Sequence, residues 1–131
     1  MGTRHRCDCC NRRRAAKFFT LSAPIWILKG GKHWCDDCIK EYNRDQNLRK
    51  RYGITAEDYD RMAAEQAGRC KSCGDTTDAD SHGVGTRLHV DHCHATGKVR
   101  GLVCQRCNLV LGHADECADR LRSVIGYLEA A

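Results

Sequence analysis

The sequence predicts a small α+β protein that is stabilised by zinc, with an N-terminal lobe resembling a zinc ribbon or finger and a second part made of a β-hairpin with flanking helices. Eleven cysteines stand among only 131 residues, and eight of them form Cys-x-x-Cys pairs. The residue pattern also changes from helical spacing to strict alternation near Arg87. Because a chain this short buries little apolar surface, we expect bound metal to supply part of its stability.

These patterns divide the chain into three ranges. Residues 1–38 form a cysteine-rich lobe that we expect to bind zinc, residues 39–53 a helical linker, and residues 54–131 a zinc-stapled domain that ends in a C-terminal helix. The first 53 residues carry a net charge of +8 and the remainder −3. The N-terminal part is therefore the expected surface for gripping phosphates, through Arg4, Arg6, Arg12, Arg13, Arg14 and Lys17.

The cysteines are interpreted as metal ligands because the chain shows no sign of export. Its first fourteen residues are dominated by Arg and Cys and lack the apolar run of a signal peptide. No stretch approaches the length of a membrane span. A protein that stays in a reducing cytosol does not usually keep disulfides. We therefore expect a cytoplasmic protein with zinc sites and no membrane partner.

The second set of paired cysteines is the stronger metal signal. Two Cys-x-x-Cys pairs are separated by thirty residues, a spacing that lets two knuckles close one tetrahedral site. Four thiolates leave no open position, so this zinc is expected to be structural. A redox role for both pairs is the alternative. The predicted ligands are Cys70, Cys73, Cys104 and Cys107.

A further zinc site is predicted in the N-terminal lobe. Its ligand choice is open, because Cys9 lies inside the first pair and His33 beside Trp34 could replace a thiolate. The alternative to a site is a set of free reduced thiols. The predicted ligands are Cys7, Cys10, Cys35 and Cys38.

Helical patterns occur in three places. A charged stretch at 36–51 without Gly or Pro predicts a connecting helix. A second helix is predicted over about 56–67, with Thr55 as its N-terminal cap and Gly68 at its end. A last helix, from about 115 to 129, would cover the core or a partner subunit with Leu121, Val124, Ile125 and Leu128.

A hairpin precedes the final helices. After a polar loop at 75–85, alternation from Arg87 to Asp91 predicts a strand, Ala95–Gly97 a turn and Lys98–Val103 the returning strand. Asn108 then marks a helix start that runs to Gly112.

The predicted zinc clamp surrounds a candidate catalytic set of Asp91, His92 and Asn108. Carboxylate and amide oxygens suit Mg²⁺, and an imidazole can accept a proton from water, which together favour phosphodiester hydrolysis. Surface histidines, transition-metal ligands or a helix cap by Asn108 are the alternatives. His89 belongs either to the strand surface or to the support of the site.

Two runs, Leu88–His94 and Gly97–Asn108, resemble the phage recombination endonuclease VII family of HNH (ββα-metal) endonucleases. The resemblance extends back through Tyr52–Tyr59 and Gly68–Gly74 and so covers about residues 52–112. It implies a ββα-metal finger stapled by a four-cysteine zinc, in a hydrolase that acts on DNA. It also implies a phage protein in the cytoplasm of a bacterial host.

The resemblance assigns roles residue by residue. It implies Asp91 and Asn108 as ligands of Mg²⁺ or Mn²⁺, His92 as general base, and His89 and His94 as supporting histidines. Family members resolve Holliday junctions and other branched DNA as intertwined dimers, and related phage proteins nick duplexes. Duplex or branched DNA and a homodimer are the implied partners. A non-catalytic zinc module that binds DNA or acts as an adaptor is the alternative function.

Overall fold

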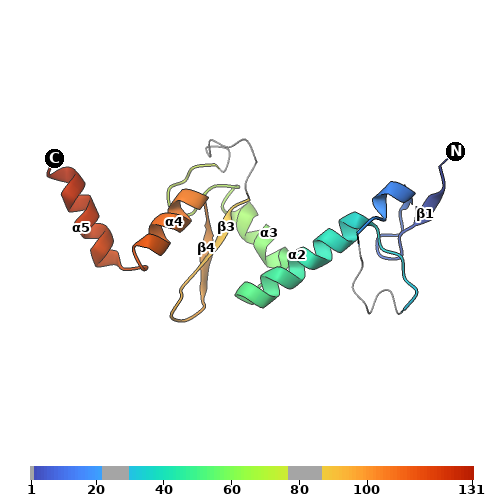
Figure 1. Cartoon of the computed structure of the whole chain (residues 1–131). Helices are drawn as coiled ribbons and strands as arrows, with labels where there is room; N and C mark the ends of the chain where they lie inside the picture. Colours follow the sequence, from blue (N-terminus) through green and yellow to red (C-terminus); the bar gives the residue numbers. More distant parts are fainter. Residues whose placement is uncertain (1, 22–29, 77–86) are drawn as a thin grey trace. The chain divides into compact units, whose positions relative to one another are not determined.

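The computed structural model describes residues 2–21, 30–76 and 87–131 (Figure 1). The chain forms two compact units, Met1–Ala56 and Glu57–Ala131. None of the helices in these described ranges combines the length and the apolar composition that crossing a membrane requires. Most of the predicted polar loop at 75–85 lies outside the described residues, and the division into three functional ranges stays a prediction.

A short hairpin opens the first unit. Strand β1 (Arg4–Arg6) pairs antiparallel with β2 (Arg13–Ala15), and the 3-10 turn η1 (Ala16–Phe18) follows. The loop between the strands carries the first Cys-x-x-Cys pair. Asn11 closes this loop with a φ of 62°, a conformation that Asn tolerates better than most residues. The hairpin thus presents the first two thiols from a tight loop.

Helix α2 (Asp36–Tyr52) completes the first unit and confirms the helix predicted at 36–51. Gly53 ends it with a φ of 69°. At its start, the buried carboxylate of Asp36 accepts hydrogen bonds from the backbone N–H groups of Thr20 (2.7 Å) and Leu21 (2.9 Å). The bond from Leu21 holds the pKa of Asp36 below its ordinary value despite burial. The carboxylate therefore anchors the preceding segment to the start of the helix.

Helix α3 (Ala56–Glu65) begins at the last residue of the first unit and ends two residues before the predicted position. The cause is Ala67 and Gly68, whose φ values of 51° and 69° cannot continue a helix. Beyond the helix, the Gln66 side chain accepts from the backbone N–H of Leu102 (3.0 Å) and donates to the Leu102 carbonyl (2.8 Å). The Gln66 side chain thus makes the two hydrogen bonds to the backbone of Leu102 that a residue of a neighbouring strand would make.

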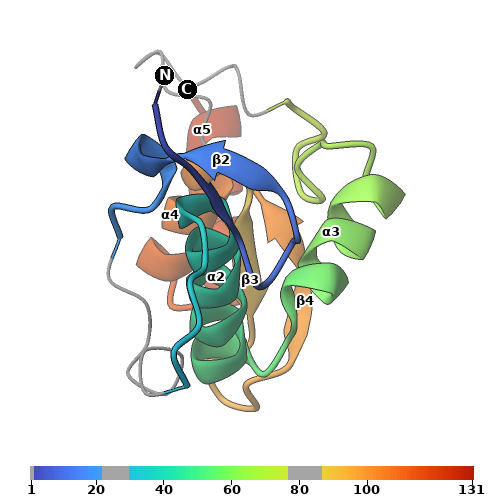
Figure 2. The same cartoon turned by 90° about the vertical axis from the view of Figure 1, so that its right-hand side faces the viewer.

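The predicted hairpin is confirmed as strands β3 (His89–His92) and β4 (Val99–Val103), which lie side by side in Figure 2. Leu102 of β4 is fully buried, and its carbonyl accepts from the backbone N–H of Lys71 at 2.9 Å. The pairing register shifts between Asp91 and His92, at the end of the strand that carries both residues. The remaining buried apolar residues of this unit are Cys70, Leu88, Val90, Val103, Cys104 and Ala114.

Helix α4 (Gln105–His113) starts three residues before the predicted position. The reason is that Cys104 occupies the N-cap, where its sulfur accepts from the backbone N–H of Cys107 at 3.5 Å. Asn108 therefore lies inside the helix, and its reading as a helix cap is wrong. The predicted small α+β fold, with a hairpin followed by a helix, is confirmed.

Helix α5 (Ala118–Glu129) begins later than predicted, because Asp115 and Glu116 adopt φ values of 51° and 56° that exclude them from a helix. None of its residues is buried, so it does not cover the core of this chain. Its predicted apolar face, with Val124, Ile125 and Leu128, is exposed.

Candidate metal centres and active site

Eight of the cysteines gather into two clusters, in each of which four sulfur atoms lie within 4.8 Å of one another. Individual Sγ–Sγ distances between 3.6 and 3.9 Å recur in them. Four ligands placed tetrahedrally about 2.3 Å from zinc are about 3.8 Å apart, whereas disulfide sulfurs are about 2.05 Å apart. The spacing fits one tetrahedral metal ion per cluster. The clusters are Cys7, Cys10, Cys35 and Cys38, and Cys70, Cys73, Cys104 and Cys107.

Each cluster holds one thiol that ionises easily. Burial opposes the ionisation of Cys7 and Cys70, but hydrogen bonds from backbone N–H groups outweigh it and lower the pKa of each thiol to about 6. Burial and the neighbouring thiols, Cys35 first, raise the pKa of Cys38. Four thiolates can therefore coexist in that cluster only when a cation compensates their charge.

The structure leaves Cys9 and His33 outside the first cluster. Cys9 is exposed. The backbone N–H of His33 donates to Asp8 Oδ2 (2.6 Å), and its carbonyl accepts from the Asp8 N–H (2.8 Å). His33 thus braces the first Cys-x-x-Cys loop through its backbone.

The candidate catalytic residues stand on two elements that contact each other. Asp91 and His92 belong to β3, and Asn108 belongs to α4, which packs against β3. Asn108 directly follows Cys107, the last cysteine of the second cluster. Asp91 is 8% exposed, and His92 and Asn108 are half-buried. A hairpin and a helix that share the second cysteine cluster therefore hold all three residues.

The two histidines predicted to support the site, His89 and His94, differ in their surroundings. The rings of His92 and His94 lie 4.9 Å apart between centroids. The backbone N–H of His94 donates to Glu116 Oε2 (3.1 Å), and its imidazole is 3.8 Å from Glu116 Oε1. His89 is exposed at the first position of β3. The structure thus brings His94 to His92 and leaves His89 on the strand surface.

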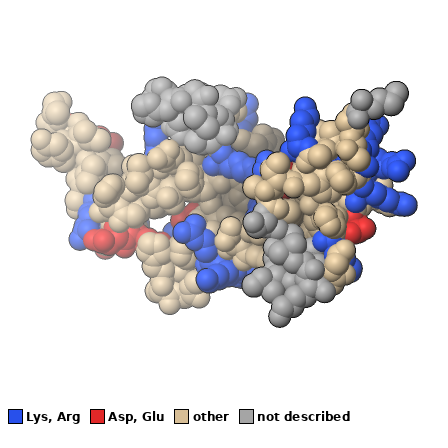
Figure 3. Space-filling model, turned by 45° about the vertical axis from the view of Figure 1, so that its right-hand side comes forward, with Lys and Arg blue, Asp and Glu red and all other residues tan. Residues whose placement is uncertain are grey.

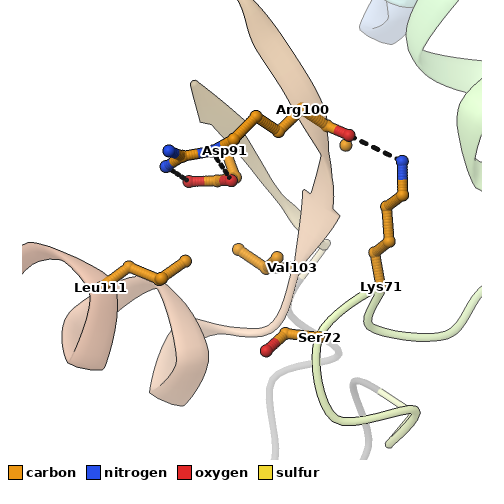
Figure 4. A pocket seen from close by; sticks show the side chains of 7 residues that line it. Lys71, Ser72, Asp91, Arg100, Val103 and Leu111 are labelled. Atoms are coloured by element: carbon orange, nitrogen blue, oxygen red, sulfur yellow. Dashed lines mark hydrogen bonds and ion pairs between the residues drawn. The ribbon is translucent and has the colours of Figure 1, made fainter. Parts of the chain in front are cut away.

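Asp91 is a buried charge, and Arg100 of β4 pairs with it (Figure 4). The guanidinium donates from Nε to Asp91 Oδ2 (2.7 Å) and from Nη2 to Oδ1 (2.8 Å). This pairing holds the pKa of the Asp91 carboxyl below its ordinary value, although burial opposes it. A bidentate pair uses two of about four lone-pair positions of a carboxylate. Asp91 therefore keeps oxygen lone pairs that fit a hard cation.

The same guanidinium binds Glu116, which lies in the linker between α4 and α5. Arg100 Nη2 donates to Glu116 Oε1 at 2.9 Å. The backbone N–H of His94 is the main cause that holds the pKa of Glu116 below its ordinary value. Neither Arg100 nor Glu116 was predicted as a site residue from the sequence. Glu116 falls at the start of the last predicted helix, and nothing in the sequence signals its contact with the hairpin.

A small cavity of about 250 Å³ adjoins this ion pair (Figure 4). Lys71 and Ser72 of the second cluster's first knuckle line it together with Leu111 of α4. Lys71 Nζ donates to the carbonyl of Arg100 at 2.7 Å. The cavity lies where the Cys70–Cys73 knuckle, the hairpin and α4 meet.

Residues 45–130 match the family model described as recombination endonuclease VII. The chain belongs to the recombination endonuclease VII family. The resemblance predicted over about 52–112 is thus confirmed, and the endonuclease VII match continues through α5.

Two phage proteins are similar to this endonuclease VII family chain. The Gene 59 protein of Mycobacterium phage D29 is 46% identical over 78 residues, and that of Mycobacterium phage L5 is 42% identical over 78 residues. Each match covers 59% of this chain and 44% of the relative. The matched segment thus spans less than half the length of these relatives.

Among solved structures, the chain is similar to the crystal structure of the ββα-Me type II restriction endonuclease Hpy99I. The TM-score is 0.42 at 21% sequence identity, covering 97% of this chain and 65% of the other. The assignment to the endonuclease VII family rests on the match to residues 45–130.

Metal content tests the two clusters. We expect two tightly bound metal ions per chain by elemental analysis, and one in Cys73→Ser, which should also unfold the second unit because such a site contributes on the order of 10 kcal/mol of apparent folding free energy. Cys117→Ser is the matched control, since Cys117 is exposed and belongs to neither cluster. Full metal content and stability in Cys73→Ser would contradict the four-thiolate site.

Proposed function

We propose that this chain is a metal-dependent DNA endonuclease of the HNH type that hydrolyses phosphodiester bonds in duplex or branched DNA. The observation that carries the proposal is the placement of Asp91, His92 and Asn108 on a hairpin and helix that one cysteine cluster clamps together. Membership of the endonuclease VII family supports the same chemistry. We also propose a phage protein that works in the cytoplasm of its host.

Two kinds of metal serve the proposed enzyme. Zinc is the ion proposed for both cysteine clusters, where four thiolates leave no position open for substrate. Asp91 and Asn108 are the proposed ligands of Mg²⁺ or Mn²⁺, which prefer oxygen donors and keep waters and substrate phosphate for the remaining positions. Such an ion supplies compensation for the charge that develops on the scissile phosphate.

The protein residues supply proton transfer and orientation. Imidazoles titrate near neutral pH, so His92 is the proposed general base that takes a proton from the attacking water. His94, whose ring lies 4.9 Å from that of His92 and which Glu116 holds, supports its position. His89 is the second proposed supporting histidine.

A cleavage assay tests the proposed function. Purified full chain is incubated with supercoiled plasmid and, separately, with a four-way junction, each with Mg²⁺, with Mn²⁺ and with chelator. We expect metal-dependent cleavage of DNA, and the relative rates show whether junctions or duplexes are preferred. DNA binding without any cleavage would identify the non-catalytic zinc module instead.

Substitution of His92 separates the proposed roles. His92→Ala should lower the cleavage rate by about a hundredfold or more, the usual scale of a lost general base, and should leave the affinity for Mn²⁺ unchanged. Asp91→Ala is the contrasting variant, because it should lower both cleavage and Mn²⁺ affinity. Both variants must keep the wild-type zinc content. Cleavage by His92→Ala at the wild-type rate would remove His92 from the mechanism.

The β1–β2 hairpin is the proposed surface for gripping DNA. Lys and Arg side chains gather on the visible face of the first unit (Figure 3). Arg4 pairs with Ala15 and Arg6 with Arg13, so these arginines share one face of the hairpin. Arg14 lies on the opposite face, 2.5 Å from Asp37. The structure thus separates basic residues that the sequence had grouped together.

Neutralising the arginine face should weaken DNA binding without changing where DNA is cut. The double variant Arg4→Ala/Arg13→Ala should lose affinity for all DNA sequences alike. In a plot of the logarithm of the binding constant against the logarithm of the salt concentration, its slope should become shallower by up to about 0.9 per lost phosphate contact. Arg14→Ala is the matched control from the opposite face. A double variant that binds normally but cuts at new positions would make these arginines recognition residues.

A further inference from the structure

Three charges meet at the proposed active site, and they come from three separate elements. Asp91 belongs to β3, Arg100 to β4 and Glu116 to the linker after α4. Arg100 contacts both carboxylates, at 2.7 and 2.8 Å to Asp91 and at 2.9 Å to Glu116. The triad formed by these three residues has a net charge of −1 when all of them are ionised.

The surroundings limit how much water screens this triad. The side chains of Asp91 and Glu116 are 11% and 15% exposed, and that of Arg100 is 39% exposed. Glu116 is also held in place, with a φ of 56° and an acceptor bond from the backbone N–H of His94 at 3.1 Å. Each charge therefore acts on its neighbours from a defined position.

We propose that Arg100 and Glu116 set the affinity with which Asp91 binds its catalytic divalent cation, Arg100 lowering it and Glu116 raising it. This inference rests on the proposed function, because it takes Asp91 as a metal ligand. Arg100 occupies one lone-pair position on each Asp91 oxygen and repels a second cation nearby. Glu116 offsets that repulsion. Both act as positioning residues.

Coulomb's law sets the scale. For charges roughly 6 Å apart, repulsion between a guanidinium and a divalent ion weakens binding by about tenfold even at the dielectric constant of water. The partly buried triad lies in a lower dielectric, so about tenfold is a lower bound for removing the Arg100 charge. Removing the Glu116 charge acts in the opposite direction, since it leaves Arg100 less compensated.

The opposite signs distinguish this inference from a merely structural role. If Arg100 and Glu116 only stapled the linker to the hairpin, removing either would loosen the site and weaken metal binding in both variants. A charge effect tightens binding in one variant and weakens it in the other. Lys at position 100 separates charge from geometry, because it keeps the charge and lacks the planar fork.

The test is a titration of the zinc-loaded full chain with Mn²⁺ at low ionic strength, with free Mn²⁺ followed by electron paramagnetic resonance. We expect Arg100→Met to bind Mn²⁺ about tenfold more tightly or better, Arg100→Lys to stay near wild type, and Glu116→Gln to bind several-fold more weakly. Arg122→Met, which removes an exposed arginine of α5, should bind like wild type. Zinc content and thermal unfolding check that each variant is folded.

Weaker or unchanged binding in Arg100→Met would overturn the inference, as would unchanged binding in Glu116→Gln. If Arg100→Met does not fold, tighter binding in Glu116→Gln would still contradict the proposed signs. Asp91→Ala keeps the two proposals apart. Loss of Mn²⁺ binding in that variant supports Asp91 as a ligand whatever the triad does, whereas unchanged binding rejects the ligand assignment itself.

Discussion

The second cysteine cluster is the constraint on which the rest of the second unit depends. The apolar core here is small, and its one fully buried large side chain among the described residues is Leu102. Cys104 serves twice, since its sulfur belongs to the cluster and also caps α4. A metal ion bound there would fix the end of β4, the knuckle and the start of α4 together. The position of Asn108, one turn into the helix, follows from that clamp.

The first unit also combines a cysteine cluster with a helix that starts at one of its cysteines. Cys35 occupies the N-cap of α2, as Cys104 does in α4, so in both clusters the later pair begins a helix. In the first unit this arrangement supports a hairpin rich in arginine. In the second it supports a hairpin that carries a carboxylate and histidines. One stabilising principle thus serves the two proposed tasks of binding DNA and cutting it.

Local patterns predicted the elements whose causes are local. Alternation identified the β3–β4 hairpin, and Gly53 marks the end of the α2 helix that the charged stretch predicted. Sequence could not predict the start of α4, because a cysteine sulfur caps it and cysteine is not a common helix cap. The start of α5 depends on the positive φ values of Asp115 and Glu116, which no local sequence pattern signals. For the same reason Glu116 was missed, since its contact with Arg100 joins residues sixteen positions apart.

Asp91 must be paired within the folded chain and, under the proposed function, must also bind a divalent cation. A carboxylate that is 8% exposed needs a partner, and leaving such a charge unpaired in a folded protein is strongly destabilising. Arg100 provides that partner within the chain. Under the proposed function, a divalent cation binds the same carboxylate, and Arg100 must then share or release it. Glu116 resolves this conflict, because it already accepts from Arg100 at 2.9 Å and keeps the guanidinium paired when Asp91 changes partner. Through Glu116, the linker before α5 is therefore part of the proposed active site, although the proposed catalytic residues all lie on the hairpin and α4.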